Sequence, residues 1–166
     1  MDLVSESLND RHDLTGFDCG KPELNLWLHN SARQAQQMRT CTTTVWHPGD
    51  DVVVGYYGLV AHVLQRDELS RAMGRGNPDR IPAVLLARLA LDQSLHGQRY
   101  GGMLLGDALA KIVVATEQVA ARFVVVDAID DDAASFYTKF GFVQTSTTGR
   151  LVRKISDIAA DNTAAR

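Results

Sequence analysis

The sequence predicts a mixed α/β fold whose first half holds antiparallel strands and whose second half holds parallel ones. Apolar, β-branched runs at 83–92 and 122–129 are separated by an apolar helical stripe that begins at Leu104. Strands joined through a helix are normally parallel. Two earlier runs, 42–46 and 52–60, are joined only by the turn-forming residues 47–51, which favours an antiparallel pair.

Length and composition indicate one globular domain. The chain has 166 residues, of which 45% are hydrophobic and 22% charged. Its longest apolar stretch, 52–61, has roughly half the length that a membrane helix needs, so no membrane partner is expected. The acidic start is unlike a secretion signal, and the two cysteines have no metal-ligand spacing. A reduced, cytoplasmic protein is therefore expected.

Charge excludes one class of function and leaves another open. The formal net charge of −3 argues against a protein that coats nucleic acid indiscriminately. Arginines nevertheless gather between 69 and 99, which fits either a local basic face or scattered solvated charges.

The remaining elements follow from periodicity and from end signals. Pro22 opens a helical stretch that runs to Met38. Residues 65–80 are polar and predict a surface excursion with a short helix. Asp130 is expected to cap a helix that Gly141 ends, and a last strand follows over 142–155. The domain is placed at 1–156, and the small, polar residues 157–166 at a flexible C-terminal tail.

A glycine-rich turn, HGQRYGG over 96–102, lies between the central strand and an amphipathic helix. Unpaired N–H groups and the helix dipole make such a helix start attractive to a phosphate. The spacing matches neither a P-loop nor the full dinucleotide pattern. Taken alone, the glycines could serve only to make a tight turn.

Several segments together resemble a known family. The loop HGQRYG, followed by Leu104 and Leu105, resembles the pyrophosphate loop of the GNAT superfamily of acyl-CoA N-acyltransferases. The chain is most similar to its TacT-type branch of tRNA-acetylating toxins through four ordered segments. These are FDCG (17–20), VGYY (54–57), LLARLALD (85–92) and FYTKFGF (136–142). The resemblance spans residues 17 to about 154.

The resemblance implies a GNAT-like mixed sheet with a splay in its parallel central pair and helices on both faces. It implies acetyl-CoA as co-substrate, with no metal, and Tyr137 as the catalytic residue that protonates the departing thiolate. The alternative for Tyr137 is a core aromatic packed among other aromatic rings. The implied cofactor-binding residues are Leu89, Ala90, Leu91, Gly97, Gln98, Arg99, Tyr100, Gly101, Gly102, Met103, Leu104, Ala133 and Phe136.

Two positions depart from the family pattern. His96 stands where the family has Gln or Arg, and Arg99 stands where it has glycine. If position 99 needs a positive φ or a close phosphate approach, an arginine costs stability or blocks binding. Alternatively, its guanidinium could pair with a phosphate. The sequence leaves both alternatives open.

The acceptor is expected to be an α-amine. The strand LLARLALD carries no carboxylate in its middle to deprotonate a lysine, and Arg88 cannot act as a base. An α-amine of pKa about 7.7 to 8.0 needs little help near neutral pH. This fits the toxin branch, which acetylates aminoacyl-tRNA. Candidates for RNA contact are Lys21, Arg33, Arg75, Arg80 and Arg88, although a structural salt bridge suits Arg88 equally well.

Three functions stay open from the sequence. The first is the toxin of a toxin–antitoxin pair, which by resemblance is a homodimer and has a ribbon-helix-helix antitoxin as its partner. The second is an N-acetyltransferase for a small-molecule or protein amine. The third is a degenerate, non-enzymatic module that binds a partner. The five histidines are scattered, with no hydrolase triad or metal motif among them.

Overall fold

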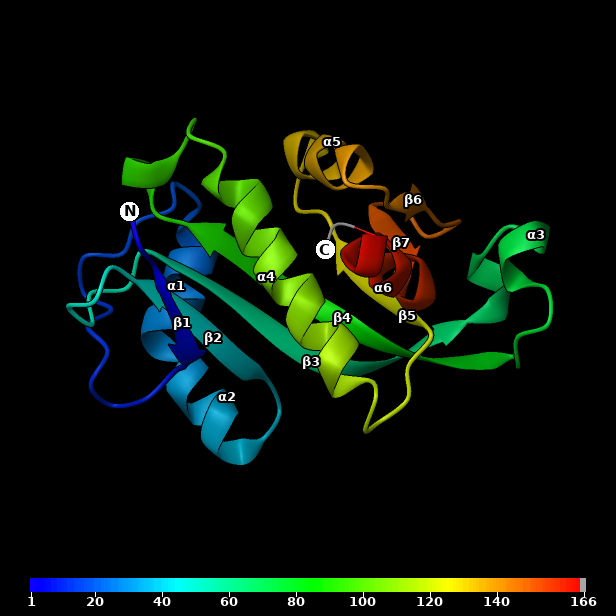
Figure 1. Cartoon of the computed structure of the whole chain (residues 1–166), viewed down its shortest axis with the longest axis horizontal. Helices are drawn as coiled ribbons and strands as arrows, with labels where there is room; N and C mark the ends of the chain where they lie inside the picture. Colours follow the sequence, from blue (N-terminus) through cyan, green and yellow to red (C-terminus); the bar gives the residue numbers. More distant parts are fainter. Residues whose placement is uncertain (165–166) are drawn as a thin grey trace. The chain divides into compact units, whose positions relative to one another are not determined.

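The computed structural model describes residues 1–164, and the strands of this range form one seven-stranded sheet in the order β1-β2-β3-β4-β5-β7-β6 (Figure 1). The strands are β1 Val4–Ser7, β2 Thr42–His47, β3 Gly55–Gln65, β4 Arg80–Leu91, β5 Phe123–Asp127, β6 Val143–Gln144 and β7 Arg150–Lys154. The helices are α1 Pro22–Asn30, α2 Ala32–Met38, α3 Arg71–Gly74, α4 Tyr100–Ala115, α5 Asp131–Lys139 and α6 Ile155–Ala164, with 3-10 turns η1 Arg66–Glu68 and η2 Gln93–Leu95. This confirms the predicted mixed α/β class.

The chain divides into two compact units. The first comprises residues 1–60 and 87–108, and the second comprises 61–86 and the residues from 109 onward. Strands β3 and β4 each contribute residues to both units. The single-domain boundary at residue 156 stays a prediction.

In the first unit, helices cover both faces of the sheet. Strands β1, β2 and β3 pair antiparallel, as the sequence predicts for the first half. Consecutive strand residues point to opposite faces of the sheet, so the contacts of Tyr56 and Tyr57 identify the helix on each face. The Tyr56 hydroxyl donates to the Leu24 carbonyl of α1 at 2.7 Å, whereas the Tyr57 hydroxyl donates to Asp107 of α4 at 2.8 Å.

The helical stretch predicted over 22–38 is interrupted. Ser31 leaves helical geometry at φ −128° and separates α1 from α2. Helix α2 then ends at Arg39, which adopts the left-handed conformation with φ 60°. Strand β1 was not predicted from the sequence, because its four residues are mostly exposed and show no apolar alternation.

In the second unit, the parallel pairing is short. Strand β4 pairs with β5 from Ala83↔Phe123 to Leu85↔Val125, and β4 then continues to Leu91. The parallel ladder thus ends before Leu89–Leu91, the part of the strand beside which the family pattern predicts a splay. The predicted last strand is instead a hairpin, in which β6 and β7 pair antiparallel across a turn that contains Gly149 at φ 78°.

Both ends of α5 are as predicted. The Asp130 carboxylate accepts the Ala133 N–H at 2.8 Å, which is the geometry of an N-cap. Gly141, at φ 89°, follows the last turn and donates its N–H to the Thr138 carbonyl.

Residues 157–164, where a flexible tail is predicted, lie in helix α6, and the flexibility of this segment stays a prediction. Helix α6 continues to Ala164, because Ile155 and Ile158 bury one face of it. Only residues 165–166 of the predicted tail lie outside the described range. Among the described residues, no helix is long and apolar enough to cross a membrane.

Candidate functional site

The predicted phosphate loop lies between β4 and α4 in the first unit. After Leu91 the chain makes the turn η2, passes through exposed residues 96–99 and enters α4 at Tyr100. The first N–H groups of this 16-residue helix have no acceptor within it, and they carry the positive end of the helix dipole. The predicted cofactor-binding residues 97–104 therefore occupy a loop and a first helical turn that suit an anion.

Arg99 has the backbone of a glycine. Its φ is 68°, close to the 74° of Gly97 two residues earlier. A non-glycine residue in this left-handed region costs about 1–2 kcal/mol relative to right-handed geometry. The concern raised by the sequence is thus confirmed in one respect: position 99 does need a positive φ, and this chain holds an arginine there.

His96 braces the loop against the end of β4. Its Nε2 lies 2.7 Å from the Leu91 carbonyl oxygen. Because a carbonyl only accepts, Nε2 must carry the hydrogen. Gln98 makes a second brace by donating from Nε2 to the Ser94 carbonyl at 3.0 Å. His96, which stands where the family has Gln or Arg, therefore has a structural role in this loop through its hydrogen bond to Leu91.

Tyr137 lies in the second unit, on α5. Its side chain is buried, and its ring centre lies 5.3 Å from that of Phe136 and 5.5 Å from that of Phe142. Burial raises the pKa of the Tyr137 hydroxyl, so the phenol keeps its proton across the neutral range. The aromatic packing of a core residue is present, and the catalytic role stays a prediction. Ala133 and Phe136, on the same helix, are half-buried.

Two of the RNA-contact candidates are engaged within the first unit. Arg33 donates from Nη2 to the His12 carbonyl at 2.6 Å, so its guanidinium holds the segment between β1 and α1. The Arg88 guanidinium lies 3.9 Å above the Trp27 ring, a cation–π contact in place of the predicted salt bridge. Lys21 is exposed at the N-cap of α1.

The other two candidates lie on the predicted excursion, which holds η1 and α3. Arg75 and Arg80 are exposed, as is Arg71. A depression of about 670 Å³ lies here, lined by Gln65, Arg66, Asp67, Leu69, Ser70, Arg71, Gly74, Arg75, Gly76 and Asp79.

Ion pairing leaves this segment positive. Asp79 pairs with Arg66, and Glu68 pairs with Arg150 at 3.3 Å. Within residues 1–164, Arg71, Arg75 and Arg80 have no ion-pair partner, and Asp67 is the acid of the segment left to offset them. The structure thus favours a local basic face over scattered charges at this place.

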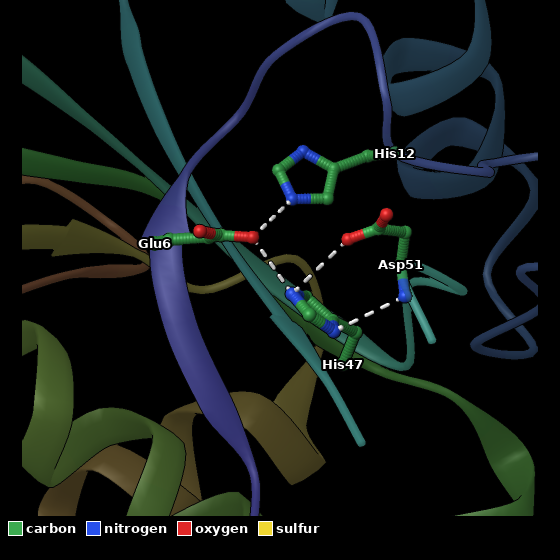
Figure 2. Close-up of side chains that lie close together, drawn as sticks. All are labelled: Glu6, His12, His47 and Asp51. Carbon is green, nitrogen blue, oxygen red and sulfur yellow. Dashed lines mark hydrogen bonds and ion pairs between the residues drawn. The ribbon is translucent and has the colours of Figure 1, made fainter. Parts of the chain in front are cut away.

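A separate cluster in the first unit joins residues that the sequence leaves scattered. Figure 2 shows Glu6 of β1 between His12 and His47, each with Nε2 2.8 Å from Glu6 Oε1. Asp51 Oδ1 lies 3.7 Å from His47 Nε2. Both imidazoles are buried. Hydrogen bonds from His12 and His47 hold the pKa of Glu6 at about 2, below its ordinary value of 4.5.

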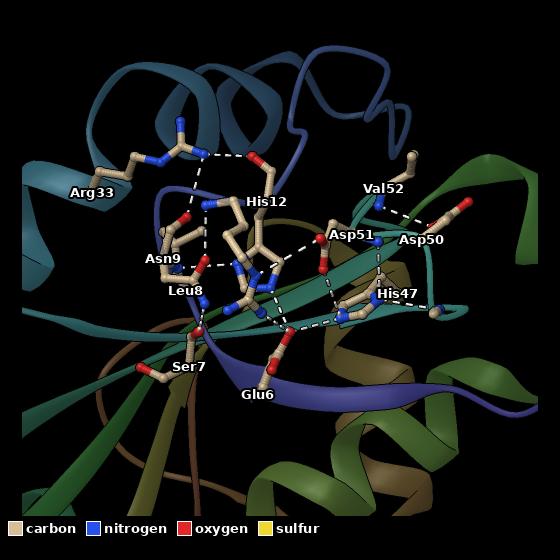
Figure 3. Close-up of polar contacts among 12 residues, drawn as sticks. Glu6, Ser7, Leu8, Asn9, His12, Arg33, His47, Asp50, Asp51 and Val52 are labelled. Atoms are coloured by element: carbon tan, nitrogen blue, oxygen red, sulfur yellow. Dashed lines mark hydrogen bonds and ion pairs between the residues drawn. The ribbon is translucent and has the colours of Figure 1, made fainter.

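These four side chains have the donor types of a metal site, but their hydrogen bonds do not fit one. Figure 3 shows that His12 Nδ1 accepts the Asn9 N–H at 3.0 Å. His47 Nδ1 likewise accepts the N–H groups of Gly49 and Asp51. Each Nδ1 therefore lacks a hydrogen and each Nε2 carries one, whereas a histidine that ligates through Nε2 donates from its other nitrogen.

The distances agree with this assignment. Two zinc ligands at bonds of about 2.0 Å would stand roughly 3.3 Å apart in a tetrahedral site. The separations of 2.8 Å are those of hydrogen bonds. The cluster is a carboxylate clamp that fastens the segment after β1 to the end of β2. Its four members are spread over residues 6–51 without motif spacing, which is why sequence reasoning missed it.

The fold and the loop together define a class of protein. A parallel pair that ends early, followed by a positive-φ loop and a long helix, is the architecture of a GNAT-type acyl-CoA N-acyltransferase. A scan against protein-family models found no match. The chain is, however, 33% identical over 137 residues to a tRNA-acetylating toxin of Mycobacterium tuberculosis, with 81% of each chain covered. It belongs to the family of tRNA-acetylating toxins.

Solved structures agree with this assignment. A mutant of KacT matches with a TM-score of 0.91 and 28% identity, covering 96% of this chain and 99% of that one. AtaT complexed with acetyl-methionyl-tRNAfMet matches with a TM-score of 0.89 and 29% identity over 97% and 99%. A mutant AtaT bound to acetyl-CoA and to the C-terminus of the antitoxin AtaR matches at 0.84 and 28% over 98% and 99%.

Proposed function

We propose that this protein transfers the acetyl group of acetyl-CoA to the α-amine of an aminoacyl-tRNA, and so blocks translation as the toxin of a toxin–antitoxin pair. The observation that carries the proposal is the 33% identity to a tRNA-acetylating toxin across 81% of both chains. The complex of AtaT with acetyl-methionyl-tRNAfMet supports the acceptor, and its complex with acetyl-CoA supports the donor.

The loop at the start of α4 fits the donor. A Cβ on Gly97 would meet nothing within 4 Å, so a phosphate can approach the backbone there. In this proposal the N–H groups of residues 97–104 hold the pyrophosphate, and the Arg99 guanidinium adds a charge-assisted contact. The family resemblance assigns the pantetheine arm to the backbone of Leu89, Ala90 and Leu91, and it adds Ala133 and Phe136 to the proposed cofactor-binding residues.

Tyr137 is the proposed catalytic residue. The neutral α-amine attacks the thioester carbon, a C–N bond forms, and the C–S bond breaks as the tetrahedral adduct collapses. The departing sulfur takes the phenolic proton of Tyr137, and the proton released by the amine nitrogen restores the phenol through solvent. Because burial raises its pKa, Tyr137 stays protonated until the thiolate forms. The pH dependence in the neutral range should therefore follow the amine of the substrate.

The acceptor surface includes the basic excursion. Arg71 and Arg75 line the depression, and Arg80 is exposed at the start of β4. These three guanidinium groups, which have no ion-pair partner among the described residues, suit phosphodiester oxygens. Lys21 is a further exposed cation, and the half-buried Arg88, whose guanidinium lies over the Trp27 ring, is another candidate. Arg33 is the weakest of the candidates, because it already holds the His12 carbonyl.

The biological setting follows from the same relatives. AtaT binds the C-terminus of the antitoxin AtaR, which supports an antitoxin partner for this chain. In the proposal that partner is a small ribbon-helix-helix protein, the toxin is a homodimer, and both act in the cytoplasm, where the pool of aminoacyl-tRNA is.

The proposal is tested by transfer of labelled acetyl from acetyl-CoA to a pool of aminoacylated tRNA. We compare wild type with Tyr137→Phe, which removes one hydroxyl without changing the ring. The matched control is Tyr56→Phe, which loses only a structural bond to the Leu24 carbonyl. General acid catalysis is typically worth about 10²–10⁴-fold, so Tyr137→Phe should lose at least about a hundred-fold in kcat. Tyr56→Phe should keep kcat within about two-fold, because a neutral hydrogen bond contributes mainly to stability.

Each outcome decides a different part. Labelled RNA with wild type, lost in Tyr137→Phe alone, supports both the acceptor and the acid. Labelled RNA with equal rates in both variants removes Tyr137 from catalysis. Binding of acetyl-CoA without any labelled RNA rejects the acceptor and favours a small-molecule or protein amine. No binding of acetyl-CoA leaves only the non-enzymatic module.

A further inference from the structure

Asp92 joins three segments where the chain leaves β4. Its N–H donates to the Val54 carbonyl at 2.8 Å, which ties it to the residue before β3. Its Oδ1 accepts the N–H of Asp18 at 3.0 Å. Its Oδ2 accepts both the N–H and the hydroxyl of Ser94, at 3.0 and 2.6 Å. One carboxylate therefore holds together the end of β4, the segment before α1 and the turn η2.

The segment before α1 is itself rigidly fixed. Asp18 of the FDCG segment accepts the Gln93 N–H on its carbonyl at 2.9 Å, beside the bond from its own N–H to Asp92. Its carboxylate accepts the Gly20 N–H and the Asn25 side chain, both at 2.9 Å. Phe17 and Cys19 are buried on either side. Residue 18 thus makes two bonds to residues 92 and 93, 74 and 75 positions further along the chain.

Glycine is favoured at the end of this segment. Gly20 has φ +87°, and a Cβ there would lie 2.9 Å from Nε2 of Gln93. Another residue would be strained at this φ and would force the Gln93 side chain of η2 to move. The FDCG segment therefore packs directly on the turn that leads into the cofactor loop.

We propose that Asp92 is a positioning residue for acetyl-CoA binding, because it fastens η2 to the FDCG segment and so fixes the loop of residues 96–99. This inference rests on the proposed function. The loop is exposed, and backbone N–H groups bind an anion well only when they are held in place beforehand. His96 and Gln98 of the loop donate hydrogen bonds to the carbonyl groups of Leu91 and Ser94, which lie on either side of Asp92 in the sequence.

Electrostatics support a positioning role over a passive one. A carboxylate beside a pyrophosphate site repels its ligand unless its charge is compensated. Partial burial would raise the pKa of Asp92, but hydrogen bonds from Ser94 and Asp18 outweigh this and lower it. The Asp92 carboxylate is therefore ionised at neutral pH, and its charge is offset by the hydrogen bonds that it accepts from Asp18 and Ser94.

The chain supplies a matched control in the same unit. Asp13 accepts the N–H and the hydroxyl of Thr15 at 3.0 and 2.7 Å, the same local turn as Asp92 and Ser94. Asp13 makes no bond to η2 or to the loop among the described residues. Asp13→Ala and Thr15→Ala therefore remove the same kind of local hydrogen bonds, but they should not weaken the binding of acetyl-CoA.

The experiment measures the Kd of acetyl-CoA by calorimetry on the full chain. A misplacement of about 1 Å at a binding group can cost up to about a hundred-fold, so Asp92→Ala should weaken binding at least about ten-fold. Ser94→Ala, which removes one of the three bonds, should weaken it about two- to five-fold. Both control variants should bind acetyl-CoA with a Kd within about two-fold of wild type, at losses of thermal stability that match those of the test variants.

The proposal is overturned if Asp92→Ala binds acetyl-CoA within two-fold of wild type, or if Asp13→Ala weakens binding equally. Should Asp92→Ala not fold, Ser94→Ala decides, and an unchanged Kd in that variant rejects the role. Wild type that binds acetyl-CoA without acetylating tRNA rejects only the proposed acceptor. Wild type that does not bind acetyl-CoA rejects both proposals together.

Discussion

Replacing Arg99 by glycine should make the protein more stable and its cofactor binding weaker. Arg99 holds φ 68° in the loop before α4. Glycine removes the left-handed cost of about 1–2 kcal/mol. It also loosens the unfolded chain, which takes back about 0.4–1 kcal/mol. The net gain is about 1 kcal/mol, or about 2–4 °C in Tm for a chain of this length.

Binding should move in the opposite direction. A charge-assisted hydrogen bond from the guanidinium to a phosphate contributes about 1.5–3 kcal/mol. Its loss corresponds to a roughly ten- to hundred-fold rise in the Kd of acetyl-CoA. Calorimetry and thermal unfolding on the same samples measure the two effects, and their opposite signs separate ligand contact from general damage.

Two further variants isolate the causes. Arg99→Ala keeps an L-residue at positive φ without the charge, so it should weaken binding without the gain in Tm. Arg39→Gly is the matched control, because Arg39 has φ 60° at the end of α2, outside the cofactor loop. It should gain similar stability and leave the Kd unchanged. If Arg99→Gly binds acetyl-CoA as tightly as wild type or more so, the guanidinium is no ligand and the residue only obstructs the site.

Three more outcomes are expected. Because the pKa of Glu6 is lowered to about 2, the contribution of its carboxylate to the free energy of unfolding is present above pH 4.5 and is lost as pH falls toward 2. Urea unfolding across this range should show that loss in wild type, and Glu6→Gln should lack it. Ile158→Ala should lower the free energy of unfolding in urea by about 2–4 kcal/mol if α6 is packed as described. An effect below about 0.5 kcal/mol would instead support the predicted flexible tail. Arg75→Ala should raise the KM for aminoacyl-tRNA and lower its log–log salt slope by about 0.7–0.9, whereas an unchanged slope would remove this face from RNA contact.

Local patterns in the sequence were sufficient for much of the fold. The cap at Asp130, the stop at Gly141 and the strand over 83–92 depend on residues a few positions apart, and all three are present. The family's glycine raised a positive φ at position 99 as one possibility, and the structure shows it.

Where local pattern was weak, prediction failed for identifiable reasons. The break at Ser31 leaves the helical periodicity on both sides intact, so the sequence reads as one helix. The polar residues after 157 suggest a tail, yet they lie in α6, which buries Ile155 and Ile158. Arg88 could have paired with an acid, but Trp27 of α1 offers its ring 61 positions away along the chain.

By itself, the sequence determined the fold class and the family and predicted a cofactor loop at residues 96–102, because periodicity, caps and ordered motifs are properties of neighbouring residues. The tertiary structure alone decided which distant groups meet. It brings Glu6 to His12 and His47, and Asp18 to Asp92, with tautomers and hydrogen bonds that turn the first set into a clamp. Such contacts join positions up to 74 residues apart, and only the folded chain fixes the distances and directions on which hydrogen bonds depend.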